Sequence, residues 1–255
     1  MLGREMPTRS SASASRSPAH SPNLAPRARR NLAREVVLAL RSDIISGRRR
    51  PGSPLAEPVL AKLFGSSRAP IREALIELER EGLVQFQTTG RTKVRSFTET
   101  DFTEIRDARV ALESMAARRA AANWTPADTA VIERNIAAQS KASTLAELSR
   151  LDIELHEYVM QHGANKRLLA LWQSVRWQFE MCLATTHRLQ QKLAFKPRNI
   201  SVSSHRRLLT ALASGKPALA AETMSSHIEG SMEWSPSYLE SDAEEAPGAA
   251  STARP

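Results

Sequence analysis

Residues 55–83 read LAEPVLAKLFGSSRAPIREALIELEREGL, and this stretch decides the fold of the N-terminal third of the chain. Apolar residues between Val59 and Phe64 predict a short helix that ends at Gly65. Ser67 can cap a second, longer helix, in which a proline in the first turn is tolerated. The expected inward face of that helix is Ile71, Leu75 and Leu78. Two helices joined by so short a turn are typical of a helix-turn-helix unit.

The residues on either side extend this unit into a larger domain. An earlier helix is predicted from four apolar residues spaced four apart, namely Leu32, Val36, Leu40 and Ile44. Residues 47–52 contain two glycines and a proline, which end that helix. After the central stretch, residues 83–86 and 93–95 indicate two strands around a hairpin tip at residues 88–91. Three helices followed by a hairpin predict a winged helix-turn-helix domain over residues 28–97.

The rest of the chain has a different texture. Residues 100–235 show helical periodicity and no strand signal, with helices expected at about 100–122, 126–140, 144–162, 166–192, 198–213 and 217–233. The predicted fold class is therefore mainly α, with an antiparallel all-helical bundle after the winged domain. Residues 1–27 are rich in Ser, Ala, Pro and Arg, and residues 236–255 are acidic. Both segments are predicted to be disordered tails, because such compositions cannot form a core.

Positive charge is concentrated in the N-terminal part. Residues 1–97 hold 18 Lys and Arg against 8 Asp and Glu, a net charge of +10, and residues 98–255 hold 18 against 19, a net charge of −1; together these give the +9 of the whole chain. A positive excess in one third of a chain is typical of a module that binds nucleic acid. The alternative is a basic tail beside a neutral protein, since the tail contributes part of the excess.

The composition excludes several classes of protein. Cys182 is the lone cysteine, which leaves no internal disulfide and no cysteine-rich zinc site. No apolar run reaches the roughly 18 residues that a membrane helix needs. The N-terminal residues lack the apolar segment of a signal peptide. The expected setting is the cytoplasm.

Two arginines mark the expected DNA-reading face. Arg68 and Arg72 are four residues apart near the start of the longer helix, so they share one side of it. Guanidinium groups in this position can bind guanine edges or phosphates in the major groove. The alternative is that they pair with Glu73 or Glu77 on a solvated face. The order of helix, helix and basic hairpin favours DNA.

Residues 55–83, with the preceding stretches 44–47 and 51–52, resemble the signature of the GntR family of bacterial regulators. The resemblance implies that a homodimer binds a palindromic operator in double-stranded DNA, and we expect a repressor. Contacts to DNA are expected from the helix start and from the hairpin. These residues are Ser67, Arg68, Ala69, Arg72, Gly90, Arg91 and Lys93.

Four polar residues fall where the helical pattern predicts burial. Asp152 lies inside the apolar stripe of its helix, and His156 lies at the edge of that stripe. His205 lies within the apolar arc of a later helix, and His227 lies on the last helix, where the arc is less sharply drawn. A carboxylate and three imidazoles that meet inside a bundle suit a divalent transition metal such as Zn, Mn or Ni. The alternative for each histidine is an ordinary hydrogen-bonded core residue.

The helical block is also similar to the FCD effector domain of the FadR-like GntR subgroup. The similarity is carried by residues 104–113, 151–156, 163–168, 205–212 and 220–227. In metal-binding members, the positions that match Asp152, His156, His205 and His227 hold the ion. Such members often sense small organic acids, and members that bind acyl-CoA lack this set. The resemblance therefore implies a small carboxylate effector.

Arg109 stands among apolar residues on the first helix of the block, which is unusual for a guanidinium. We predict that it holds the carboxylate of the effector. The alternative is an internal pair with Glu113, four residues later. The remaining histidines of the block, His162 and His187, have no matching geometry and are expected at the surface.

Three functions remain open at this point. The first is a regulator whose operator binding is controlled by the effector, and such a protein is not an enzyme. The second is a metal-dependent hydrolase, which would need a general base. The candidates, Glu154 and Glu157, are displaced from the face that carries Asp152 and His156. In the third, the metal is purely structural and the effector binds elsewhere or not at all.

Overall fold

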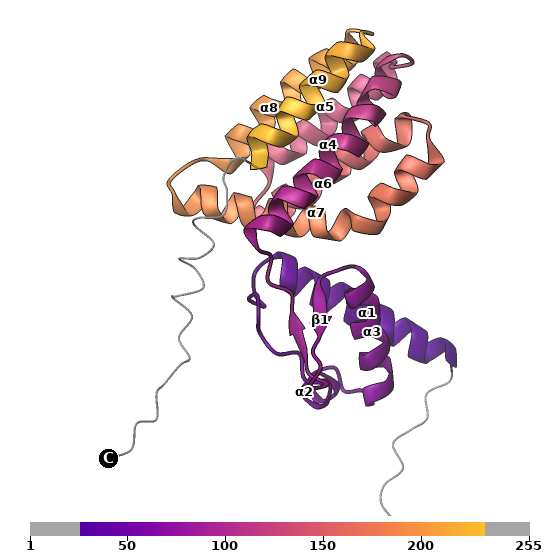
Figure 1. The fold of residues 1–255 in the computed structure, drawn as a ribbon, viewed down its shortest axis with the longest axis vertical. Coiled ribbons are helices and arrows are strands. Elements are labelled where there is room, and N and C mark those ends of the chain that lie inside the picture. The colour runs from indigo at the N-terminus through magenta and orange to yellow at the C-terminus, as the bar shows by residue number, and fades with distance from the viewer. Residues whose placement is uncertain (1–25, 233–255) are drawn as a thin grey trace, which may run out of the picture.

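The computed structural model describes residues 26–232, which form two lobes (Figure 1). The smaller lobe, the head, consists of α1 (Pro26–Ile45), α2 (Glu57–Leu63), α3 (Arg68–Arg80), β1 (Val84–Phe86) and β2 (Thr92–Val94). The larger lobe, the bundle, consists of α4 (Glu99–Ala121), α5 (Pro126–Lys141), α6 (Leu145–His162), α7 (Lys166–Lys192), α8 (Pro197–Ala213) and α9 (Pro217–Met232). The predicted winged helix-turn-helix and all-helical bundle are confirmed. The bundle helices begin and end within one residue of their predicted bounds.

α1 begins at Pro26, two residues before the predicted start of the head. The disordered tails that we predict lie, apart from residues 26 and 27, outside the described residues. None of the described helices is both long and apolar enough to cross a membrane.

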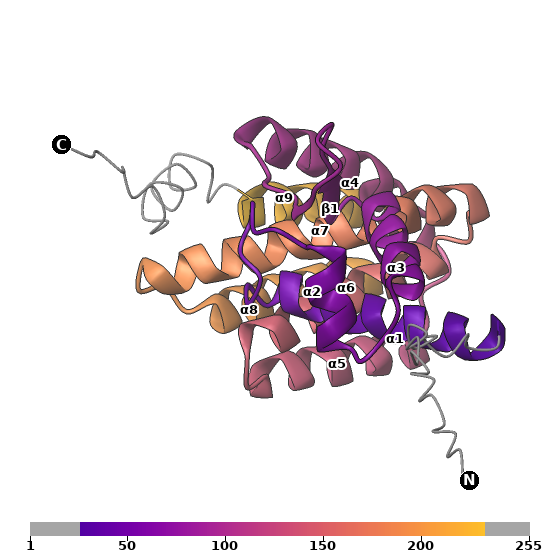
Figure 2. The ribbon, with the colours of Figure 1, turned by 90° about the horizontal axis from the view of Figure 1, so that it is seen from below.

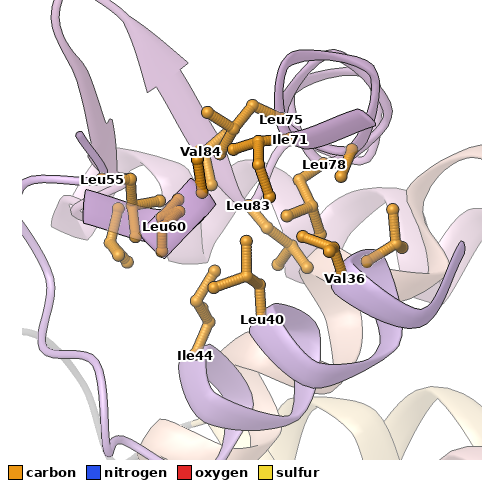
Figure 3. Packing of buried hydrophobic residues seen from close by; sticks show 14 of the residues in the cluster. Val36, Leu40, Ile44, Leu55, Leu60, Ile71, Leu75, Leu78, Leu83 and Val84 are labelled. Carbon is orange, nitrogen blue, oxygen red and sulfur yellow. The ribbon is translucent and has the colours of Figure 1, made fainter. Parts of the chain in front are cut away.

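The head closes around an apolar core built from α1, α3 and the wing (Figure 3). Most of the predicted inward residues are fully buried, namely Val36, Leu40, Ile44, Ile71, Leu75 and Leu78, whereas Leu32 near the start of α1 is only half-buried. β1 and β2 are antiparallel, with Val84 opposite Val94, and both of these valines join the core. Full burial of each such side chain contributes roughly 1.5–3 kcal/mol. The surface residues of the head are therefore supported by a well-packed apolar core.

One cap differs from the prediction. Ser67 occupies the N-cap position of α3, but its side chain makes no capping hydrogen bond. A cap bonds the backbone N–H two or three residues later. The third residue after Ser67 is Pro70, which has no N–H, so one of the two possible donors is missing. In the bundle, by contrast, Thr98 with Asp101 forms a complete capping box at the start of α4.

α7 packs against the head, because it lies on the side of the bundle that faces the head (Figures 1 and 2). Met181 of α7 is buried in the apolar core of the head. The Arg41 guanidinium of α1 stacks over the Trp177 ring at 3.9 Å. Arg188 donates through Nη1 to the carbonyl of Ile45 at 2.7 Å. The head is thus packed against one helix of the bundle rather than tethered by a linker alone.

Gly82 lies at a close contact between the two lobes. Its φ is +74°, and a Cβ at this position would lie 2.6 Å from Nε2 of Gln178 on α7. A side chain at Gly82 would therefore strain the backbone and push Gln178 away.

Candidate metal centre and DNA-reading face

Three histidines from three helices converge inside the bundle. His156 on α6 and His205 on α8 have no exposed surface, and His227 on α9 is 9% exposed. Nε2 of His156 lies 3.0 Å from Nε2 of His227, and one nitrogen from each ring lies within 4.8 Å of the others. The carboxylate of Asp152 lies 3.5 Å from Nε2 of His156 and 3.6 Å from Nε2 of His205. The structure therefore brings together all four residues that we predict to be ligands.

The spacing of these atoms fits a bound ion. Metal–nitrogen bonds of about 2.0–2.1 Å in a tetrahedral site place neighbouring ligand atoms about 3.3 Å apart. The separations of 3.0 Å between His156 and His227 and of 3.5 Å between His156 and Oδ1 of Asp152 lie on either side of that value. Oδ2, the other oxygen of Asp152, lies 3.6 Å from Nε2 of His205. Within the described part of the chain, Oδ1 of Asp152 and Nε2 of His205 are buried without a hydrogen-bond partner. A buried polar atom without a partner is costly, and a divalent cation between these atoms would satisfy both.

The other nitrogen of each ring is held from outside the cluster. The Nδ1 partners are Glu113 for His156 at 2.5 Å, Gln139 for His205 at 2.8 Å and Ser204 for His227 at 2.7 Å. A carboxylate or amide oxygen only accepts, so Nδ1 of His156 and of His205 carries the ring proton. Their Nε2 lone pairs then face the cluster, as metal-binding histidines require.

The charges of the cluster suit a divalent cation. Burial lowers the pKa of His205 to about 4, although the charge of Asp152 opposes this. Burial also lowers the pKa of His227 well below its ordinary value. Burial would raise the pKa of Asp152, but His205 and His156 outweigh it and lower the pKa on balance. At neutral pH, His205 and His227 are neutral and Asp152 is ionised, which are the forms that bind metals.

Of the two interpretations of Arg109, an effector-binding guanidinium or an internal pair with Glu113, the structure contains the internal pair. It is 1% exposed, and its Nε donates to Oε1 of Glu113 at 2.9 Å. Burial would raise the pKa of Glu113, but the charges and hydrogen bonds of Arg109 and His156 hold that pKa well below its usual value. Arg109 is an internal ion-pair partner in this geometry. It is not among the residues that line the cavity beside the cluster.

A cavity of about 140 Å³ adjoins the cluster. Asp152 and His227 form part of its wall, and Arg207 supplies the basic side chain of the lining. Much of the remaining wall carries hydroxyl and amide groups, from Thr186, Gln190, Ser201, Ser204, Ser226 and Ser231. Among the described residues, Oγ1 of Thr186 and Oε1 of Gln190 are buried without a hydrogen-bond partner. The cavity therefore offers unsatisfied polar groups that a small ligand with polar atoms can bind.

The prediction that His187 lies at the surface is wrong. His187 is 2% exposed and lines the cavity. Its Nδ1 lies 2.8 Å from Oγ of Ser149, and its Nε2 lies 3.3 Å from Oγ of Ser201. The buried Leu183 lies one turn earlier on α7, so the i, i+4 spacing was a signal for this inward face. His162, by contrast, is only partly buried and pairs with Asp128 at 3.0 Å.

The predicted DNA-reading residues lie at the surface of the head. Ser67, Arg68 and Arg72 are exposed, as are Gly90 and Arg91 of the hairpin tip, and Ala69 and Lys93 are half-buried. Within residues 26–232, neither Arg68 nor Arg72 forms a salt bridge, and Glu77 lies 4.0 Å from Arg41 instead. Gly90 has a φ of +76° with open space where a Cβ would be. These side chains are free to meet a ligand outside the protein.

Known proteins resemble the chain in both lobes. Residues 32–94 match the family described as "Bacterial regulatory proteins, gntR family", and residues 104–230 match the FCD domain. The HTH-type transcriptional regulator YdhC of Bacillus subtilis (strain 168) is 30% identical over 147 residues, which cover 56% of this chain and 66% of YdhC, just under two thirds. The "Probable D-xylose utilization operon transcriptional repressor" of Paenarthrobacter nicotinovorans is 28% identical over 205 residues, covering 78% of this chain and 87% of that protein. A solved GntR transcriptional regulator from Rhodococcus sp. RHA1 has the same fold, with a TM-score of 0.64 at 22% identity over 79% of this chain and 96% of that one.

Proposed function

The chain belongs to the GntR family of bacterial DNA-binding transcriptional regulators and carries an FCD domain, and we propose that it is a repressor controlled by a small organic acid. As a member of this family it is a regulator and not an enzyme. In the proposed mechanism a homodimer acts in the cytoplasm on a palindromic operator. The acid binds beside the metal centre and changes the affinity of the head for that operator.

The surface of the head supports operator binding by the predicted residues. Arg68 and Arg72 lie exposed at the start of α3, and neither forms an ion pair with another described residue. Arg91 and Lys93 extend the basic surface onto the hairpin of β1 and β2. An exposed arginine pair at the start of a recognition helix suits bidentate contacts to guanine. Two heads in a dimer would read two half-sites of one palindrome. The D-xylose operon relative is named as a repressor, which supports repression here.

The cavity beside the four ligand residues is the observation that supports control by an effector. Asp152, His156, His205 and His227 would hold Zn, Mn or Ni, and the ion would supply a Lewis acid to a carboxylate oxygen of the effector. Arg207 lines the same cavity and can pair with carboxylate charge. A cavity of roughly 150 Å³ holds a molecule the size of benzene. The volume of about 140 Å³ therefore favours a compact acid over an acyl chain.

α7 supports a connection between the cavity and the head. Thr186, His187 and Gln190 line the cavity, whereas Met181 and Trp177 pack against the head. A ligand that shifts this helix would change how the head is held. Such a shift requires the ligand to bind the two arrangements with different affinity.

Two measurements on the purified full chain test the proposal. The first is fluorescence anisotropy with promoter-proximal DNA and with scrambled duplex of equal length, at several salt concentrations. The second is a thermal-shift screen of acetate, lactate, malonate and gluconate on zinc-loaded and chelated protein. We expect preference for the promoter DNA, and stabilisation of the loaded form alone by one of the compact acids, because selective binding to the native state raises stability.

The outcomes separate the parts of the proposal. Equal affinity for both duplexes contradicts operator recognition. A melting temperature that falls on chelation but responds to none of the acids would leave the metal structural. An acid that stabilises the protein without changing operator affinity contradicts effector control.

A further inference from the structure

Glu113 of α4 is the point at which three helices of the bundle meet. It accepts hydrogen bonds from Nε of Arg109 at 2.9 Å, from Nε1 of Trp172 on α7 at 2.8 Å and from Nδ1 of His156 on α6 at 2.5 Å. The side chains of Arg109 and Glu113 are each 1% exposed. A carboxylate with this many donors is fixed in position.

Stability alone is a weak reason for such a pair. Burying an ion pair costs desolvation that its own attraction barely offsets, and apolar residues of the same volume would often serve as well. The contact that apolar residues could not replace is the one to His156. An ionised carboxylate can only accept, so it keeps the imidazole proton on Nδ1 and the Nε2 lone pair on the side of Asp152.

We propose that Glu113, held by Arg109 and Trp172, is a positioning residue of the metal centre. It would fix the tautomer and the orientation of His156 and make the imidazole a stronger donor, as second-shell carboxylates do. Arg109 would then serve the metal centre by holding Glu113, rather than by binding the carboxylate of the effector. This inference rests on the proposed metal site and extends it.

The other two histidines differ from His156 in the partner of Nδ1. Nδ1 of His205 faces the amide of Gln139, and Nδ1 of His227 faces the hydroxyl of Ser204, both of which are neutral. Within the described part of the chain, His156 is the one of the three histidines whose Nδ1 has a charged partner. The substitution Glu113→Gln would give His156 the same type of partner that His205 has. It therefore removes the charge while an acceptor oxygen remains.

The bundle offers a matched control. Glu180 is also a buried carboxylate, 4% exposed, and it pairs with Arg176 four residues earlier at 3.2 Å. In the described structure it makes no hydrogen bond or ion pair with the four ligand residues. Glu180→Gln thus repeats the same chemical change in the same helical pattern, away from the metal centre.

The test is zinc affinity of the full chain, measured by competition with a chromophoric chelator. We expect Glu113→Gln to bind zinc roughly 10- to 100-fold more weakly than the wild type, and Glu180→Gln to stay within about threefold. Equal affinity in all three proteins overturns the positioning role and leaves the metal site standing. Failure of the wild type and of Glu180→Gln to bind zinc, manganese or nickel overturns both.

A second readout does not depend on the stability of any Glu113 variant. The chain has only 6 histidines, so 15N-histidine NMR of the metal-free wild type can report each tautomer, with His156→Gln to assign the signal. We expect the His156 proton on Nδ1. A proton on Nε2 overturns the inference.

A further variant serves if Glu113→Gln does not fold. Trp172→Phe removes one donor to Glu113 and keeps an aromatic ring, and we expect a smaller but measurable loss of zinc affinity. Unchanged affinity counts against the positioning role.

Discussion

The head carries its candidate functional side chains on the exterior of the protein, whereas the bundle carries its own in the buried interior. The core of the head is apolar, and its arginines stand outside it. The bundle buries Arg109, Glu113, Asp152, His156 and His205 in its interior. A change at an exposed arginine should alter binding and leave the fold unchanged, whereas a change at a buried polar residue alters both. Each variant of the bundle therefore needs a control of the same type and burial.

The largest expected effect is at the metal centre. His205→Ala removes one of the four proposed ligands. Structural zinc sites bind with about 10–16 kcal/mol in total, so we expect a loss of roughly 3 kcal/mol, or about 100-fold in affinity. His187→Ala is the control, because it also removes a buried histidine but one bonded to Ser149 and Ser201. Isothermal titration with zinc measures both. An equal loss in the two variants would mean that general damage to the core explains the effect.

The next effect is at the exposed face of the head. Arg72→Ala should weaken operator binding by roughly 10- to 100-fold, because a bidentate arginine contact contributes about 1–3 kcal/mol. Its free energy of unfolding should stay within about 0.5 kcal/mol of the wild type. Arg118→Ala, at an exposed position of α4, is the control for loss of one positive charge. Anisotropy titrations that show the same weakening in both variants would reduce the role of Arg72 to net charge.

A pH experiment distinguishes a buried from an exposed histidine in the bundle. Burial lowers the pKa of His187 against the pull of Asp152, so the unfolded chain takes up this proton more readily than the folded one. The stability that His187 contributes is therefore complete above about pH 6.5 and is lost as the pH falls below that value. We expect the melting temperature of chelated wild type to fall more steeply between pH 6.5 and 5 than that of His187→Asn. Parallel curves would indicate that His187 is solvated after all.

The smallest effect concerns the contact between the two lobes. Gly82→Ala and Gly65→Ala each place a side chain at a positive φ, of +74° and +59°, which costs about 1–2 kcal/mol. Only Gly82→Ala also meets Gln178, at 2.6 Å, and that flexible side chain can move. We expect Gly82→Ala to be slightly less stable than Gly65→Ala in thermal melts. It should also show a smaller effect of the acid on operator affinity, and an unchanged effect would argue against α7 as the connection.

The sequence predicted most of the fold because periodicity reports burial directly. The apolar repeats predict each of the bundle helices to within one residue of its bounds, and they place Asp152 and His205 on inward faces without information on the neighbouring helices. Arg68 and Arg72 were found for the opposite reason, since they lie outside the apolar face of α3. Each of these inferences uses one helix at a time.

Contacts between helices could not be found in this way. Gln139 and Ser204 hold their histidines from other helices, and no spacing within one helix indicates such partners. Arg109 stands out in the sequence because a guanidinium among apolar residues is unusual. Its relation to His156 passes through Glu113 and depends on how α4 packs against α6. The predicted capping hydrogen bond of Ser67 is absent for a local reason, because Pro70 has no backbone N–H to donate.

Met181 has a consequence for how such proteins could be recombined. This methionine is part of α7, yet it completes the apolar core of the head. A hybrid regulator joined between β2 and α4 would pair one head with the α7 of another protein, and a smaller residue there would leave a void that costs about 2–5 kcal/mol. The unit of this chain that could be transferred intact is therefore the winged head together with α7. A successful exchange of helical bundles would have to keep a residue of matching volume at the position of Met181.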